Sequence, residues 1–163
     1  MEEEVFEARE ELKRIEHIVF VSLKYTRTTD VLRNGLLRFV SFYDILVNGY
    51  LLHAEEKGLI EKIPKSPALA VKQLMKLYPD DAKLQQYLGL YFFVKGLLKK
   101  PYDKINEYRR HVGMLFHLSE ENGDEYNRTV AINIDSLEAT EWYLNNFFSF
   151  SLKFLDLAKE EDY

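Results

Sequence analysis

The sequence contains no cysteine, and it has only four prolines and seven glycines among its 163 residues. The absence of cysteine excludes disulfides and every thiolate metal site, and it fits the reducing environment of a cytosol. No run of about 18 uncharged apolar residues is present, so we expect no membrane-spanning helix and no membrane partner. The start, Met1-Glu2-Glu3-Glu4, is acidic, and a secretory signal needs a basic and then an apolar segment. We therefore expect no such signal and a cytoplasmic location.

Positive charge is also scarce, with 22 Lys and Arg against 27 Asp and Glu and a formal net charge of −5. A protein that binds nucleic acid through its overall field would carry the opposite sign. Such binding would need a local basic patch, and two sets of residues are candidates: Lys95, Lys99, Lys100, Lys104, Arg109 and Arg110, and Arg27, Arg33 and Arg38. Either set is equally consistent with an ordinary solvated face. Abundant Glu, Lys and Tyr without Cys is typical of thermophile proteins.

Apolar side chains are plentiful, because they make up 47% of the residues and include 11 Phe and 11 Tyr. This is enough for one core, and the length suits one domain, which we expect to span residues 1–163. Apolar residues recur at three- and four-residue steps along most of the chain, which is typical of amphipathic helices. Caps, prolines and glycines between these segments predict helices over residues 2–25, 30–57, 67–77, 81–99, 102–118 and 135–159.

The predicted fold class is all-α, a single bundle of five or six helices. Residues 30–57 are apolar around most of the helix circumference, so this long helix should lie buried at the centre of the bundle. Residues 129–134 alternate weakly between apolar and polar side chains. They could form a short strand or an extended strap, and we favour a loop unless the segment pairs across a dimer.

Standard catalytic motifs are missing from the sequence. It has no P-loop, no glycine-rich dinucleotide turn and no serine hydrolase elbow. The histidines are His17, His53, His111 and His117, and their spacing matches neither zinc nor di-iron helical signatures. We therefore expect no bound metal and no cofactor.

The predicted helix over residues 102–118 carries the most informative pair. Arg110 and His117 are seven residues apart, so on one continuous helix they would lie about 20° apart around the axis and roughly 10 Å apart along it. A guanidinium offers fixed charge and forked donors for phosphate, and an imidazole exchanges a proton near neutral pH. Together they are the minimum for metal-independent RNA cleavage, in which His117 moves the proton and Arg110 stabilises the developing charge.

The segment Arg110-His111-Val112-Gly113-Met114-Leu115-Phe116-His117 resembles the motif of the HEPN superfamily, in which four to six residues separate Arg from His. The resemblance implies an all-helical core over about residues 30–159 and a homodimer whose seam joins two motifs in one RNase site. It also implies RNA or a nucleotide as the partner. Arg110 and His117 would be the catalytic residues. The candidate binding residues are His111 within this segment and, just before it, Asn106, Glu107 and Arg109.

Blander interpretations stay open for each of these features. Arg110 and His117 could belong to a solvated helix face with a Glu107–Arg110 pair, and His111 could be a boundary residue of the core. The chain would then be a non-catalytic interaction protein, or a small subunit of a larger ribonucleoprotein assembly.

Two further surfaces each have two interpretations. The aromatic residues between Trp142 and Phe154 could fill the core or form a platform for stacked bases. A polar stripe on the central helix could face solvent or line a polar cleft, and it consists of Asn34, Arg38, Ser41, Asp44 and Asn48.

Overall fold

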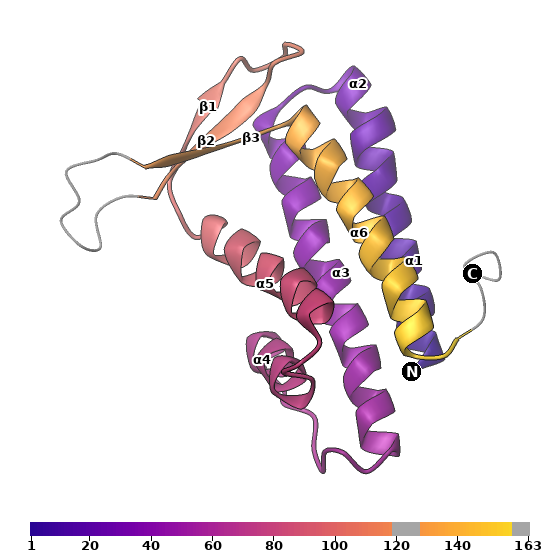
Figure 1. Cartoon of the computed structure of the whole chain (residues 1–163). Helices are drawn as coiled ribbons and strands as arrows, with labels where there is room; N and C mark the ends of the chain where they lie inside the picture. The colour runs from indigo at the N-terminus through magenta and orange to yellow at the C-terminus, as the bar shows by residue number, and fades with distance from the viewer. Residues whose placement is uncertain (119–127, 158–163) are drawn as a thin grey trace.

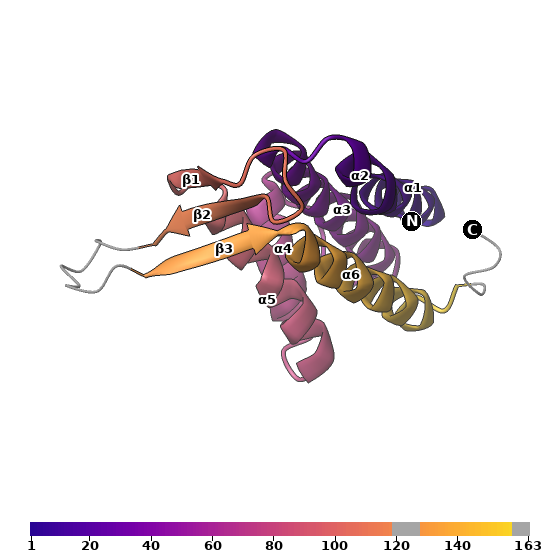
Figure 2. The same cartoon turned by 90° about the horizontal axis from the view of Figure 1, so that it is seen from above.

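The computed structural model describes residues 1–118 and 128–157. Helices dominate, and a small antiparallel sheet stands at one end of them (Figures 1 and 2). The elements in chain order are α1 (Glu2–His17), the π-helical segment η1 (Ile18–Ser22), α2 (Leu23–Tyr25), α3 (Thr29–Glu56), α4 (Pro67–Leu77), α5 (Ala82–Leu97), β1 (Tyr102–Ile105), β2 (Gly113–His117), β3 (Thr129–Asn133) and α6 (Ile134–Phe154). The prediction of a mainly helical chain with a long buried helix is confirmed, and the all-α class is wrong because of the sheet.

The first four predicted helices are confirmed to within two residues at each end. α1, η1 and α2 follow one another over the predicted range 2–25, and α4 has the predicted bounds. The Thr28 hydroxyl accepts a hydrogen bond from the backbone N–H of Val31 at 3.3 Å, and the Asp81 carboxylate accepts one from Leu84 at 3.0 Å. These are the N-cap bonds that threonine and aspartate make at helix starts.

The long helix α3 is the core of the molecule. It packs against α1, α4, α5 and α6, and β2 reaches its upper end (Figure 1). The buried Tyr43 and Tyr50 satisfy their hydroxyls inside the core, on the Tyr87 carbonyl at 2.6 Å and on the Ser151 hydroxyl at 2.7 Å. Within the described ranges α3 is the one helix long and apolar enough to cross a membrane, but 56% of its most apolar window is buried by the other elements. Its composition is accounted for by this central position.

The predicted helix over residues 102–118 is wrong, because this segment forms the hairpin β1–β2. In β2 Met114 and Phe116 are fully buried, whereas Leu115 and His117 between them are partly exposed, and this alternation is that of a strand. The apolar positions of the segment fit both a helical and a two-residue period. The turn decides between them, since Asn106 and Tyr108 have φ angles of 53° and 67°, which no helix contains.

The loop that we favoured for residues 129–134 is wrong, because residues 129–133 form β3 and pair with β2 within the same chain, as in the strand alternative. The sheet order is β1-β2-β3, with both pairs antiparallel and with Phe116 opposite Tyr102 on one side and Val130 on the other. β3 runs directly into α6 through Asn133, whose side chain caps the helix by accepting a hydrogen bond from the Ser136 N–H at 2.9 Å. α6 ends at Phe154, and residue 159, where we expected its end, lies outside the described residues.

The β1–β2 turn docks on the start of α3. The Glu107 carboxylate accepts hydrogen bonds from the backbone N–H of Thr29 at 3.0 Å and from its hydroxyl at 2.6 Å. The Tyr108 N–H donates to the Arg27 carbonyl at 2.6 Å. These bonds satisfy a donor at the N-terminus of the core helix and lower the pKa of Glu107, chiefly through the side-chain bond with Thr29.

We expect Glu107→Ala to lower the free energy of unfolding by about 1 kcal/mol, the usual cost of a lost helix cap. Because the carboxyl pKa is depressed in the folded state, this contribution is present at neutral pH. It disappears as the pH falls through the folded pKa. Urea unfolding of both proteins at several pH values measures this difference, and Glu61→Ala, at an exposed loop position, is the control. A difference that persists unchanged in acid would contradict the role of the charged carboxylate.

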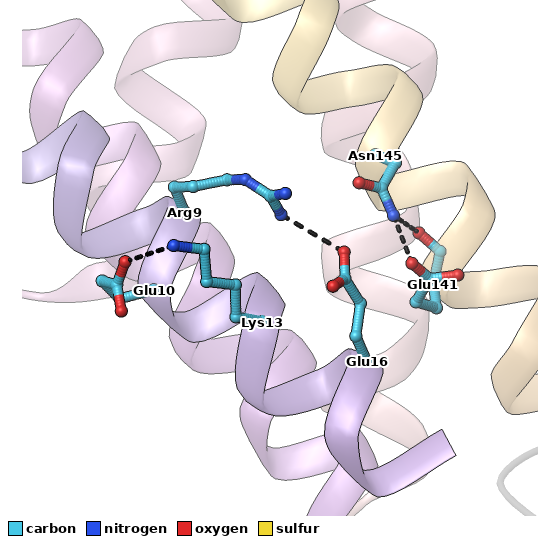
Figure 3. Close-up of polar contacts among 6 residues, drawn as sticks. All are labelled: Arg9, Glu10, Lys13, Glu16, Glu141 and Asn145. Carbon is cyan, nitrogen blue, oxygen red and sulfur yellow. Dashed lines mark hydrogen bonds and ion pairs between the residues drawn. The ribbon is translucent and has the colours of Figure 1, made fainter. Parts of the chain in front are cut away.

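Charged side chains also lie between α1 and α6 (Figure 3). Arg9 reaches along α1 to Glu16, with Nη1 3.2 Å from Oε1, while Glu141 on α6 accepts a hydrogen bond from the Asn145 amide. Glu141 is only 8% exposed. Its burial raises its pKa, the negative charge of Glu16 raises it further, and the bond from Asn145 opposes both.

We expect Glu141→Gln to raise the unfolding temperature at neutral pH, because it removes a carboxylate whose ionisation is disfavoured in the folded state. A raised folded pKa means that the gain is complete above that pKa and is lost as the pH falls below the unfolded value. Thermal unfolding followed by circular dichroism at pH 4 and pH 7 tests this. The control Glu61→Gln, at an exposed loop position away from Glu141, should change little at either pH.

Candidate functional site

The structure does not place Arg110 and His117 on one helix line. Arg110 lies in the β1–β2 turn and His117 is the last residue of β2, and β2 alone is about 13 Å long. The Arg110 guanidinium is 3.3 Å from Asp135 at the start of α6, and His117 Nε2 is 2.8 Å from Asp103 on β1. Each is thus turned toward a different exposed carboxylate, and the alignment from which a shared phosphate site was predicted is absent.

The four predicted binding residues also belong to this turn. The Asn106 amide donates to the His111 carbonyl at 3.3 Å, and the Asn106 carbonyl accepts from the Arg109 N–H at 3.1 Å. Arg109 and His111 point their side chains into solvent, and Glu107 caps α3. The contacts of Asn106 and Glu107 shape the turn and fix it on the core.

A polar cleft lies instead between α1 and α3. Its volume is about 390 Å³. One wall is a line of charged residues on α1, the other is the start of the polar stripe on α3, and η1 closes one end. We call this the arginine cleft, and its lining residues are Glu10, Lys13, Arg14, His17, Ile18, Ser22, Asn34 and Arg38.

The two arginines of the cleft are held by one buried carboxylate. Glu11 is 3% exposed, and it accepts Nη1 of Arg14 at 2.8 Å and Nη1 of Arg38 at 3.1 Å. Arg14 comes from α1 and Arg38 from α3, so Glu11 ties the two helices together at the cleft. The two arginine side chains nevertheless remain about half exposed.

Most of the donor capacity of both arginines stays available. A guanidinium has five N–H donors, and each of these two gives only Nη1 to a partner among the described residues. Because Glu11 fixes their positions, their remaining donors are directed without a large loss of side-chain entropy on binding.

The π-helical segment η1 lies where His17 and Ser22 bring an imidazole and a hydroxyl group to the arginine cleft. Its backbone bond from the Leu23 N–H to the Ile18 carbonyl joins residues five apart, so this turn is wider than a turn of an α-helix. His17 and Ser22 have this spacing and both line the cleft. Short π-helical segments occur frequently at functional sites, and this one directly follows the histidine.

The charge of the cleft is positive in a chain that is negative overall. Lys13, Arg14 and Arg38 give three positive charges, and Glu10 and Glu11 give two negative ones, which leaves +1 with His17 neutral. The Glu10 carboxylate forms an ion pair with the Lys13 ammonium at 2.9 Å (Figure 3). This donor set can hold an anion, whereas no group of three metal-ligating side chains occurs in the parts of the chain that the structure describes.

The α3 wall of the arginine cleft could be predicted from the sequence. The polar stripe on α3 was expected to be either a solvent face or a cleft wall, and Asn34 and Arg38 line the arginine cleft. Asp44 and Asn48, farther along the stripe, line a second cleft with Glu4, Glu7 and the loop before α4. The contribution of α1 was missed, although its residues 10, 13, 14 and 17 have the spacing of one helix face.

A scan against protein-family models, a search of curated proteins and a search of solved structures each gave no match. The resemblance to the HEPN superfamily therefore stays a prediction.

We expect Glu11→Ala to lower the free energy of unfolding by about 1–2 kcal/mol, the lower part of the range for hydrogen bonds to charged groups, since both arginines are half exposed. Glu10→Ala, which breaks the exposed pair with Lys13, should cost no more than about 0.5 kcal/mol. Urea unfolding curves give both values. Equal losses in the two variants would contradict the special position of Glu11.

Proposed function

We propose that this protein binds a phosphate-bearing ligand, a nucleotide or a phosphate group of RNA, in the arginine cleft. The observation that carries the proposal is the buried Glu11 carboxylate, which holds Arg14 and Arg38 from two different helices at the floor of one cleft. Planar guanidinium groups with free donors match the oxygen atoms of a phosphate better than a lysine ammonium does.

The size and charge of the site favour a small ligand or the end of a chain. The cleft volume of about 390 Å³ is within the range of small-molecule pockets. A long polyanion would be repelled by the net charge of −5, so long-range attraction does not assist its association. Recognition then depends on the local contacts with the two arginines.

His17 and Asn34 complete the recognition set. Both line the cleft beside the arginines, and an imidazole or an amide N–H can donate to a phosphate oxygen.

We expect Arg38→Ala to weaken binding of AMP by about tenfold to a hundredfold, the equivalent of losing one or two charge-assisted hydrogen bonds. Isothermal titration calorimetry at low salt measures this, with inorganic phosphate and adenosine as the two partial ligands. Arg33→Ala is the matched control, because Arg33 is an arginine of the same helix outside the cleft lining. Binding of phosphate but not of adenosine locates the recognition on the phosphate.

A second comparison separates the arginine cleft from the hairpin. The double variant Arg110→Ala/His117→Ala should bind AMP as the unmodified chain does, because neither residue lines the cleft. If the double variant loses binding while Arg38→Ala retains it, the phosphate site is on the hairpin and our proposal is wrong. No heat with any of the three ligands would overturn it as well.

A further inference from the structure

Another concave surface, distinct from both clefts described above, lies between α5 and α6, away from the α1–α3 seam. Its volume is about 670 Å³, and two helix lines form it. The line on α5 carries Lys83 and Tyr87, and the line on α6 runs from Trp142 to Lys153 with Tyr143 and Phe150 beside it. The α6 line is about 16 Å long, since eleven helical residues separate its two ends. We call this surface the aromatic groove.

The floor of the aromatic groove is a fixed stack of rings. Tyr87 lies 5.1 Å from Tyr143 and 5.4 Å from Phe150, centroid to centroid, and it stacks on the buried Phe147 at 4.7 Å and 21°. The Tyr143 hydroxyl is anchored on the Gln86 carbonyl at 3.4 Å. This surface is therefore preformed by the core packing of α5 against α6.

Trp142 stands apart from this stack. It is 67% exposed, and none of the ring contacts among the described residues includes it. An exposed indole at the rim of a groove leaves a large flat apolar surface in water, where an exposed apolar side chain gains nothing for the fold. From the sequence, the aromatic residues of α6 could fill the core or form a platform for stacked bases. Phe147 and Phe148 fill the core, because they are fully buried, whereas Trp142 does not.

The charges of the described residues that line the groove are all positive. Within residues 1–118 and 128–157, Lys83 and Lys153 are its only charged lining residues, although acidic residues outnumber basic ones in the chain. The Lys83 ammonium lies 6.0 Å from the centroid of the Phe150 ring, so it is held over the aromatic floor. Asn146 continues the line on α6 and offers an amide group between Trp142 and Lys153.

We propose that the aromatic groove binds single-stranded nucleic acid, with a base stacked on Trp142 and phosphates paired with Lys83 and Lys153. Every base has a flat face that stacks on an aromatic side chain, and the phosphates between bases supply the charge that matches lysines at both ends of the groove. An apolar helix of a partner would cover Trp142 but would leave the amide of Asn146 and both ammonium groups without partners. This inference does not depend on the arginine cleft.

The test uses the fact that Trp142 is the only tryptophan of the chain. Titration with the eight-nucleotide strands oligo(U) and oligo(dT) should quench its fluorescence in a saturable manner, whereas the same sequence in a duplex should not. The two strands distinguish an RNA from a DNA preference. Lys83→Ala and Lys153→Ala should each weaken binding and lower the slope of log affinity against log salt by about 1.

Binding by the tryptophan variants is measured by anisotropy of a labelled strand. Trp142→Ala should bind roughly fivefold to a hundredfold more weakly, and Trp142→Phe, which keeps a ring, should recover part of this loss. Phe93→Ala is the matched control, because Phe93 is an exposed aromatic residue of α5 outside the groove lining. Circular dichroism melting confirms that each variant is folded.

Three results would overturn the proposal: no quenching by either strand, equal quenching by the duplex, or a Trp142 spectrum that changes with protein concentration alone. The last result would assign the groove to a second copy of the chain. Arg38→Ala should leave the quenching unchanged, so failure at the arginine cleft and failure at the aromatic groove are distinguishable.

Discussion

Burial of α3 is the constraint on which the rest of the structure depends. The helix has apolar side chains around most of its circumference, and no single neighbour can cover them. α1, α4, α5 and α6 pack around it, and β2 covers its upper end. Each of these elements therefore turns its apolar face inward, and the positions of the two candidate sites follow from what remains on the outer faces and in the seams between helices.

The arginine cleft is a consequence of a charged residue in such a seam. Glu11 lies between α1 and α3, where burial of an unpaired carboxylate would be strongly unfavourable. Arg14 and Arg38 pair with it from both helices. The same interaction that permits the burial also fixes two cations at the surface, and these two cations are the centre of the anion site that we propose.

The sheet has a comparable double role. Its inner face adds Met114 and Phe116 to the core, and its β1–β2 turn supplies Glu107 to the first turn of α3. The side chains of Asn106 and Glu107 are thereby committed to the turn and to α3, and that of Arg110 to a neighbouring carboxylate, whereas the Arg109 side chain is exposed. A motif that resembles a catalytic one in the sequence is, in three dimensions, a structural hairpin that closes the end of the helix group.

The sequence by itself determined the helices of residues 2–25, 30–57, 67–77 and 81–99, because their periodicity and caps are local signals. It also determined that α3 is central, since a helix that is apolar on most sides must be surrounded. It could not determine the state of residues 102–118, whose apolar positions fit two periods. The turn at Asn106 and Tyr108 and the pairing of β2 with both β1 and β3 decide for strands.

Tertiary structure alone also decided which charged residues meet. Arg38 and Asn34 could be placed on a polar stripe from the sequence, but their meeting with Glu11 and Arg14 depends on the angle and register at which α1 packs on α3. In the same way, Trp142 and Phe147 are close in the sequence of one helix, and their opposite exposures follow from the side on which α5 lies. Local patterns specify helices and faces, whereas the contacts between faces are set by packing around α3.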